Sequence, residues 1–303
     1  MAPLGLGAGF YGLGPTISSD NATILQSFGD ACRFSGSDVN QERCPGYIDI
    51  DNDFQTTIRA SFTVSFWVKH RDGRENDGYT NQHYFSIGVG NTSLTNPIDE
   101  FSIMSVYDGT LLTILRANGD SHWNDTDAAH IADGQGDWQH IAVTVTKNSS
   151  GNTTSIIYVD GDPVDTSIVS SREITDSNQE TFEGHADVKT TIGATRDDAA
   201  SGTDSYLAFD GDMKEVAIWN VALDDAAIEK IEDLSYTNAN LLVDDGAYDV
   251  SGNLVGYWKL NDYSGLTAVD SKGSNDGTIK PSSIFGPSGF TTADGIDLPP
   301  FFV

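Results

Sequence analysis

The chain has 303 residues and a formal net charge of −29, because 45 acidic side chains outnumber 16 basic ones. A surface this acidic repels phosphate backbones, so we expect no binding to nucleic acid. No apolar run approaches the roughly 20 residues that a membrane-spanning helix needs, so we expect no membrane insertion. The acidity has two interpretations: solubility in a salty medium, where salt screens self-repulsion, or a surface that collects Ca²⁺.

The N-terminal segment is rich in glycine. Its first 20 residues contain five glycines and no Lys or Arg. A secretory signal needs a basic start and an unbroken apolar stretch, so this segment matches one poorly. We predict an extended arm over residues 1–27, in which Phe10 and Tyr11 are candidates for contacts with other subunits.

The two cysteines, Cys32 and Cys44, lie twelve positions apart around a polar loop. This spacing permits a disulfide bond but does not show one. A bond closing so short a loop would contribute roughly 3 kcal/mol at best. The other interpretation is a pair of reduced, partly buried thiols, so the cysteines do not fix the compartment.

Alternation of apolar and polar residues predicts strands. Residues 62–68 place Phe or Val at every second position, so one face is apolar and should point into a core. The Asp-Gly pair at 108–109 separates two apolar runs, which is typical of a hairpin. Residues 141–145 alternate in the same way, and the Asp-Gly pair at 160–161 tolerates the positive φ angles of a tight hairpin.

The second half of the chain continues the pattern and adds a helix. Residues 214–219 and 254–260 alternate like the earlier strands. Residues 223–234 carry acids in the first turn, which suits the helix dipole, and apolar residues at three-residue spacing. We predict a short helix there that covers one edge of the sheets.

Residues 236–303 form a C-terminal extension. They could supply strands that complete the same sheets or form a small appendage. We favour the first, because a short segment with few core aromatics would struggle to fold alone. The extension ends in an apolar segment with Phe301 and Phe302, which we predict to pack against another molecule or another part of the chain.

Several segments occur together in the order of a known family. They are Trp138-x-His140 before an alternating strand, YVDG at 158–161, SFTVSFWVK at 61–69, and FDGDMKEVAIWNVAL at 209–223. Over residues 28–235 the chain therefore resembles the laminin-G-like form of the concanavalin A-like lectin/glucanase superfamily. The segment that joins GYWKL to NDGTI is similar to one found in laminin-G-like structural proteins of marine bacteriophages.

The resemblance implies an all-β fold, namely a two-sheet antiparallel jelly-roll sandwich. We expect it to carry one short helix, the extended arm and a C-terminal β extension. Members of the family usually serve as binding or structural modules. They catalyse reactions only where a carboxylate motif has been added. A fold of this kind does not by itself fix the function.

Catalytic residues are not evident. In the family that this chain resembles, laminarinase-like glycosidases carry Glu-x-Asp-x-x-Glu on one strand, so that alternate acids face the cleft; this pattern is absent from the sequence. The strands at 61–69, 141–146 and 214–219 contain one acid between them, Glu215, which cannot serve both as nucleophile and as acid. His140 follows Trp138 at a strand start and fits a structural histidine. We therefore expect no enzymatic activity.

Two kinds of binding site are candidates. The first is a Ca²⁺ site, the one cofactor we consider, built from acids in loops at the sheet ends. Its candidate ligands are Asp72, Asp77, Asp125, Asp127, Asp197 and Asp198. The second is a glycan contact at Trp123 in the predicted loop 119–125, together with His122 and Asn124. Trp67 and Trp219, in contrast, should pack under the helix or the extension.

Two functions follow from these features, with an enzyme as a remote third. The main hypothesis is a non-enzymatic structural protein of the virion surface, such as a phage capsid decoration or fibre component that also adheres to host glycans. Its partners would be other virion subunits or further copies, held through the arm and the C-terminus. The alternative is a carbohydrate-binding, lectin-like module of a secreted or cell-surface bacterial protein.

Overall fold

The protein is described by a computed structural model. It describes residues 26–27, 32–34, 46–51, 54, 57, 60–70, 81–88, 100–106, 108–117, 120–131, 136–147, 153–171, 190–197, 205–209, 211–236, 240–261 and 267–281. Phe10, Tyr11, Cys44, Phe301 and Phe302 lie outside these residues, and so do the contacts and the disulfide bond considered for them.

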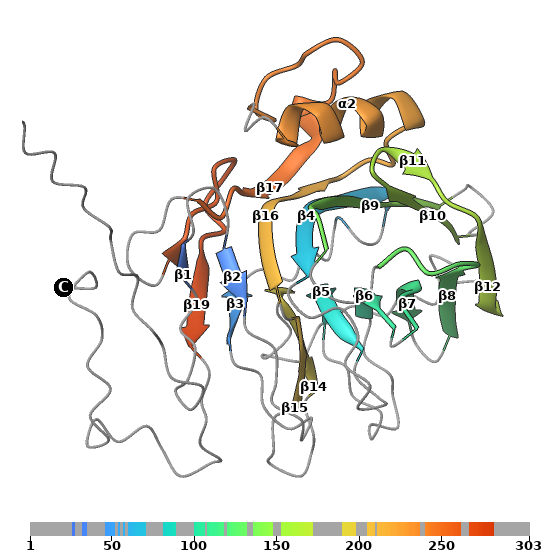
Figure 1. The fold of residues 1–303 in the computed structure, drawn as a ribbon. Helices are drawn as coiled ribbons and strands as arrows, with labels where there is room; N and C mark the ends of the chain where they lie inside the picture. The colour runs from blue at the N-terminus through green and yellow to red at the C-terminus, as the bar shows by residue number, and fades with distance from the viewer. Residues whose placement is uncertain are drawn as a thin grey trace, which may run out of the picture.

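Two antiparallel sheets face each other (Figure 1). Sheet A runs in the order β1 (Gln26–Ser27), β2 (Cys32–Phe34), β16 (Gly211–Trp219), β4 (Phe62–His70), β9 (Gln139–Lys147), β10 (Thr153–Val159) and β11 (Asp162–Pro163), and β17 (Leu254–Trp258) pairs with β16. Sheet B runs in the order β12 (Thr166–Ser171), β8 (Asp120–Thr126), β7 (Leu111–Ala117), β6 (Glu100–Ser105), β5 (Gln82–Ile87), β13 (Thr190–Ile192), β3 (Gly46–Ile50), β19 (Gly277–Pro281) and β18 (Thr267–Ala268). This architecture confirms the predicted jelly-roll sandwich.

Smaller elements complete the described fold. Strands β14 (Ala194–Asp197) and β15 (Ser205–Ala208) form a separate two-stranded ribbon. Helix α2 spans Asp225–Tyr236, and the 3-10 helix η1 spans Ser251–Asn253. No helix in the described ranges has the length and apolar character that a bilayer crossing requires.

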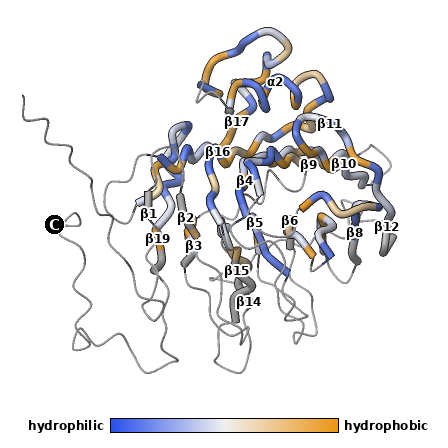
Figure 2. Tube along the Cα trace, in the orientation of Figure 1, coloured by the Kyte–Doolittle hydropathy of each residue, from blue (hydrophilic) through white to orange (hydrophobic). Residues whose placement is uncertain are grey.

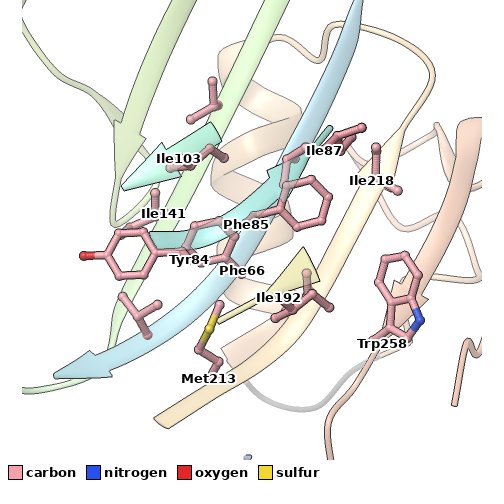
Figure 3. Close-up of a cluster of buried hydrophobic side chains, with 14 of the residues drawn as sticks. Phe66, Tyr84, Phe85, Ile87, Ile103, Ile141, Ile192, Met213, Ile218 and Trp258 are labelled. Atoms are coloured by element: carbon pink, nitrogen blue, oxygen red, sulfur yellow. The ribbon is translucent and has the colours of Figure 1, made fainter. Parts of the chain in front are cut away.

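The inner faces of the two sheets form the main core. Strand β4 contributes Phe62, Val64, Phe66 and Val68, all of which are fully buried, as the alternation predicted. Side chains from both sheets interdigitate in this layer, as Phe66 and Phe85 show in Figure 3. Burial of this apolar surface supplies most of the drive for the two sheets to pack.

Helix α2 covers the outer face of sheet A (Figure 1). It begins after Asp224, whose carboxylate accepts a hydrogen bond of 2.9 Å from the backbone nitrogen of Ala227. This contact satisfies one of the free N–H groups at the helix start. Hydrophobic and hydrophilic residues alternate along the helix (Figure 2), and its apolar side chains form a second core with Trp219. The helix begins two residues later than the predicted 223–234 and covers a sheet face rather than an edge.

The C-terminal extension contributes strands to both sheets. Strand β17 pairs with β16 in sheet A, and β19 pairs with β3 in sheet B. The link between them is ordered by Asp270, whose carboxylate accepts hydrogen bonds from the backbone nitrogens of Tyr257, Lys272 and Asn275. Described residues of the extension are thus part of the sandwich.

The tight hairpin at 160–161 has the predicted backbone. Asp160 and Gly161 have φ angles of 50° and 83°. Both values lie in the left-handed region, as a type I′ turn requires. The turn joins β10 to β11 and places Gly161 against helix α2, where a Cβ atom at this position would lie 3.5 Å from the Cα of Glu229.

Candidate functional site

Strand β8 separates the three residues that the sequence suggested for glycan contact. Residues 120–126 form a strand between β7 and β12, not the loop that we expected. Neighbouring side chains of a strand point to opposite faces. Trp123 therefore lies on the outer face of sheet B, whereas His122 and Asn124 point between the sheets.

His122 and Asn124 hold the two sheets together. A ring nitrogen of His122 lies 3.1 Å from Ser155 Oγ, and the Asn124 amide donates a hydrogen bond of 3.0 Å to the Ser155 carbonyl oxygen. Both side chains are buried, and burial lowers the pKa of His122. Their polar groups face strand β10, so a sugar on the outer face would not touch them.

Trp123 belongs to a small apolar cluster on the outer face of sheet B. We call this cluster the Trp123 face; it comprises Met104, Val106, Leu112, Ile114 and Trp123. Ile114 lies directly opposite Trp123 in the strand register. Met104, Leu112 and Ile114 are buried, whereas Val106 and Trp123 are half-buried, so the face reaches solvent at Val106, in the turn before β7, and at Trp123 on β8.

A row of small hydroxyl side chains continues the Trp123 face across sheet B. The register aligns Ile114 with Ser102, Ser102 with Ser86, and Ser86 with Thr191. The hydroxyl oxygens of Ser86 and Ser102 lie 3.1 Å apart. Both serines are buried, so this part of the outer face is closed to solvent.

Three acids border the accessible end of the Trp123 face. Asp125 shares a strand and a face with Trp123 and lies opposite Leu112. Its Oδ1 atom is buried and has no hydrogen-bond partner within the described residues. Burial raises the pKa of Asp125, and the negative charges of Asp108 and Asp127 add to the rise, although hydrogen bonds from Thr110 and the Thr126 backbone oppose it.

The two flanking acids are exposed and engage local hydroxyl groups. The Asp108 carboxylate accepts hydrogen bonds from the backbone nitrogen and the hydroxyl group of Thr110, at 3.0 and 2.7 Å. The Asp127 carboxylate accepts one from the Ser167 hydroxyl group. Neither Asp108 nor Thr110 was among the predicted site residues. The signal that could have found them is the Asp-Gly turn at 108–109, which leads into the start of β7, the part of that strand that pairs with the end of β8.

Two other described acids, Glu215 and Asp49, lie away from the Trp123 face. Glu215 is buried under helix α2 on the opposite sheet, where it accepts a hydrogen bond from the Tyr257 hydroxyl group. Asp49 lies in the register row of Trp123 but five strand positions away, which at about 4.8 Å per strand is roughly 24 Å. The carboxyl groups of glycosidases lie within about 10 Å of each other.

Binding of Ca²⁺ by the candidate acids remains a prediction. Within the described residues, no three His, Cys, Asp or Glu side chains lie together in a way that could hold a metal ion. Asp125 and Asp127 both border the Trp123 face. Asp72, Asp77 and Asp198 lie outside the described residues, as does the side chain of Asp197.

The remaining candidates from the sequence are buried under the helix, as expected. The Trp67 indole donates a hydrogen bond to Ser235, and the Trp219 indole donates one to Tyr248. His140 is fully buried and its ring lies 5.4 Å from that of Trp67. Its ring nitrogens have no hydrogen-bond partner within the described residues, and burial lowers its pKa to about 3.

Several solved structures are similar to this chain. A proposed carbohydrate-binding protein from Bacteroides ovatus is 19% identical, with a TM-score of 0.50 over 87% of this chain and 61% of that chain. The CBM40 domain of the Ruminococcus gnavus IT-sialidase, bound to α2,3-sialyllactose, is 17% identical, with a TM-score of 0.43 over 67% of this chain and 96% of that chain. The leech intramolecular trans-sialidase is 16% identical, with a TM-score of 0.45 over 68% of this chain and 27% of that chain.

These identities show a shared fold only. The chain spans 61% of the length of the B. ovatus protein. Among curated proteins, none matches it significantly. The sequence model described as the concanavalin A-like lectin/glucanases superfamily matches residues 45–229, which is more than half of the 303 residues. The chain therefore belongs to the concanavalin A-like lectin/glucanases superfamily.

Proposed function

We propose that the protein is a carbohydrate-binding module without catalytic activity, and that a sugar binds at the accessible end of the Trp123 face. The observation that carries the proposal is the position of Trp123. Its half-buried indole shares one sheet face with apolar side chains and with Asp125, a hydrogen-bond acceptor.

The chemistry of this face suits a sugar. A pyranose ring offers an apolar face of C–H groups and a rim of hydroxyl groups. An aromatic side chain supplies a large flat apolar surface for the former, and a few fixed polar groups orient the latter. Trp123 can supply the surface and Asp125 the polar contact, because the two side chains lie two positions apart on one strand.

A binding role accords with the positions of three acids. In the described part of the chain, Glu215 lies on sheet A, whereas Asp49 and Asp125 lie far apart on sheet B. A binding role is also what the description of the B. ovatus protein states for that protein. Such a module would act outside the cell or at a cell surface, where glycans are encountered.

The virion hypothesis rests on other parts of the chain. Its support came from the glycine-rich arm, the apolar C-terminus, the acidity and the resemblance of the GYWKL to NDGTI segment to phage proteins; the arm and the C-terminus lie almost entirely outside the described residues. No described contact favours it over a lectin-like module. It remains a prediction, to be checked by finding whether particles contain this chain.

The proposal is tested by glycan binding to the full chain. An array should identify bound oligosaccharides, and titration calorimetry should give their affinities for the wild type and for Trp123→Ala. Loss of an aromatic stacking contact of about 1.4 kcal/mol corresponds to a tenfold weaker affinity. Trp138→Ala is the matched control, because Trp138 is half-buried beside Lys214 of sheet A, away from the Trp123 face.

Two results would contradict the proposal. An array without any bound glycan, with and without Ca²⁺, would remove the carbohydrate-binding function. Equal affinities for wild type and Trp123→Ala would move the site elsewhere. Circular dichroism of both variants would verify that each chain remains folded.

A further inference from the structure

We infer that the Trp123 face selects uncharged glycans and rejects glycans that carry a carboxylate, because Asp125 and its two acidic neighbours occupy the rim of the face. This inference rests on the proposed function and names the class of its ligand. The strands that carry the face, β6, β7 and β8, lie together in sheet B (Figure 1).

The position of Asp125 suits contact with the same sugar unit that stacks on Trp123. Two residues along a strand span about 6.7 Å, which is comparable with the width of one sugar ring. Asp125 is half-buried, so part of its side chain is accessible beside Trp123. An ionised carboxylate only accepts hydrogen bonds, so its partner on the ligand must be a donor such as a hydroxyl group.

The same carboxylate disfavours an anionic ligand. A sialic or uronic acid would bring a second carboxylate to a rim that already holds Asp108, Asp125 and Asp127. Like charges at this distance repel, and the partial burial of Asp125 reduces the screening by water and salt. The net charge of −29 acts in the same direction at longer range.

The test compares matched neutral and acidic glycans. The ligands are the strongest neutral oligosaccharide on the array and its counterpart carrying one sialic or uronic acid. Calorimetry on the full-length wild type should give at least tenfold tighter binding of the neutral member, with a ratio that shrinks as salt is raised. Asp125→Asn should weaken binding of the neutral glycan and narrow the ratio between the two ligands.

Asp162→Asn is the matched control. Asp162 is exposed on β11 of sheet A, so this variant removes the same charge away from the Trp123 face. It should leave both affinities and their ratio unchanged. If it narrowed the ratio as much as Asp125→Asn, net charge rather than the rim would set the selectivity, and the assignment to Asp125 would be overturned.

The remaining outcomes separate this inference from the proposed function. If the acidic glycan bound as tightly as the neutral one, or more tightly, the charge selectivity would be wrong while a carbohydrate-binding function would stand. If neither glycan bound and the array were empty, the proposed function would fail, and the inference with it. If the acidic glycan bound at least as tightly as the neutral one and Trp123→Ala bound neither, the binding site would still be assigned to the Trp123 face.

Discussion

The indole nitrogen of Trp67 donates a hydrogen bond of 2.7 Å to Ser235 Oγ, which joins strand β4 to the last turn of helix α2. Trp67 is only 2% exposed, so its N–H group has no access to water in the folded chain. We expect Ser235→Ala to lower the free energy of unfolding by about 1–3 kcal/mol, because it leaves a buried donor unpaired. Urea denaturation monitored by tryptophan fluorescence measures this change.

The control for this prediction is Ala226→Ser on the same helix. Residue 226 is exposed, so replacing Ala with Ser there, the reverse of the change at residue 235, alters only the local helix propensity. We expect a change within about 0.5 kcal/mol. Equal losses in the two variants would mean that the contact with Trp67 contributes nothing to stability.

A second contact under helix α2 involves a buried acid. The Tyr257 hydroxyl group donates a hydrogen bond to Glu215, which is 1% exposed. Burial raises the pKa of Tyr257 well above its usual range, and the Glu215 charge raises it further. We expect Tyr257→Phe to cost about 2–3 kcal/mol of unfolding free energy, since it deprives a buried carboxyl group of a donor.

Tyr158→Phe provides the comparison for this contact. The Tyr158 hydroxyl group also donates to a carboxylate, that of Asp225, at 2.8 Å. Asp225 is exposed, so water can replace the lost donor. We expect less than about 1 kcal/mol for Tyr158→Phe. A larger loss there than in Tyr257→Phe would contradict the assigned importance of burial at Glu215.

Alternation in the sequence was sufficient to predict the inward faces of the central strands. Phe62, Val64, Phe66 and Val68 all enter the main core, because a strand fixes which residues share a face. The Asp-Gly pair at 160–161 was equally informative, since its residues tolerate the required φ angles. Such local rules need no knowledge of distant partners.

Local sequence rules did not predict strand β8 or the faces on which its side chains lie. Its sequence, DSHWNDT, is polar and poor in β-branched residues, so it was predicted as a loop. Pairing with β7 and β12 makes it a strand. That pairing places Trp123 and Asp125 on one face and sends His122 and Asn124 to the other, which changes the composition of the candidate site.

Strand β16 contains a second feature that the sequence did not reveal. Its pairing with β4 is irregular between Lys214 and Ala217, and Glu215 has a positive φ angle of 55°. The irregularity lets Lys214 lie against the rings of Trp67 and Trp138 while Glu215 reaches Tyr257. A bulge depends on the partner strand, so alternation within one strand does not predict it.

Gly193 allows close packing beside the main core. Its φ angle is 82°, and a Cβ atom there would lie 2.3 Å from the ring of Phe34. We expect Gly193→Ala to cost roughly 2–5 kcal/mol, from the left-handed backbone and from overpacking against the ring. Thermal and urea unfolding would both show the loss.

Gly252→Ala is the matched control for Gly193→Ala. A Cβ atom at Gly252 would meet no other described atom within 4 Å, and the φ angle of Gly252 is not left-handed. The substitution there should change stability by less than about 0.5 kcal/mol. If both variants were equally stable, the ring of Phe34 would have to move aside without cost, contrary to the packing described for this core.

Buried histidines should make the fold sensitive to mild acid. Burial lowers the pKa of His70 to about 4 and that of His140 to about 3, from an ordinary value of 6.5. Between these values and pH 6.5, the unfolded chain binds protons that the folded chain does not. Stability is therefore complete above about pH 6.5 and falls as the pH is lowered, by about 2 kcal/mol per histidine at pH 5.

The contribution of His140 is isolated by His140→Phe, which keeps a ring next to Trp67 but cannot take up a proton. Unfolding free energies at pH 7.5 and pH 5 should differ less in this variant than in the wild type, by about 2 kcal/mol. Carboxyl groups whose pKa is raised, such as Asp125, titrate in both chains and cancel in this comparison. Ser235→Ala, in the same layer, should be less stable than the wild type but keep its full pH dependence. An unchanged pH dependence in His140→Phe would show that this ring is not the neutral, buried group described here.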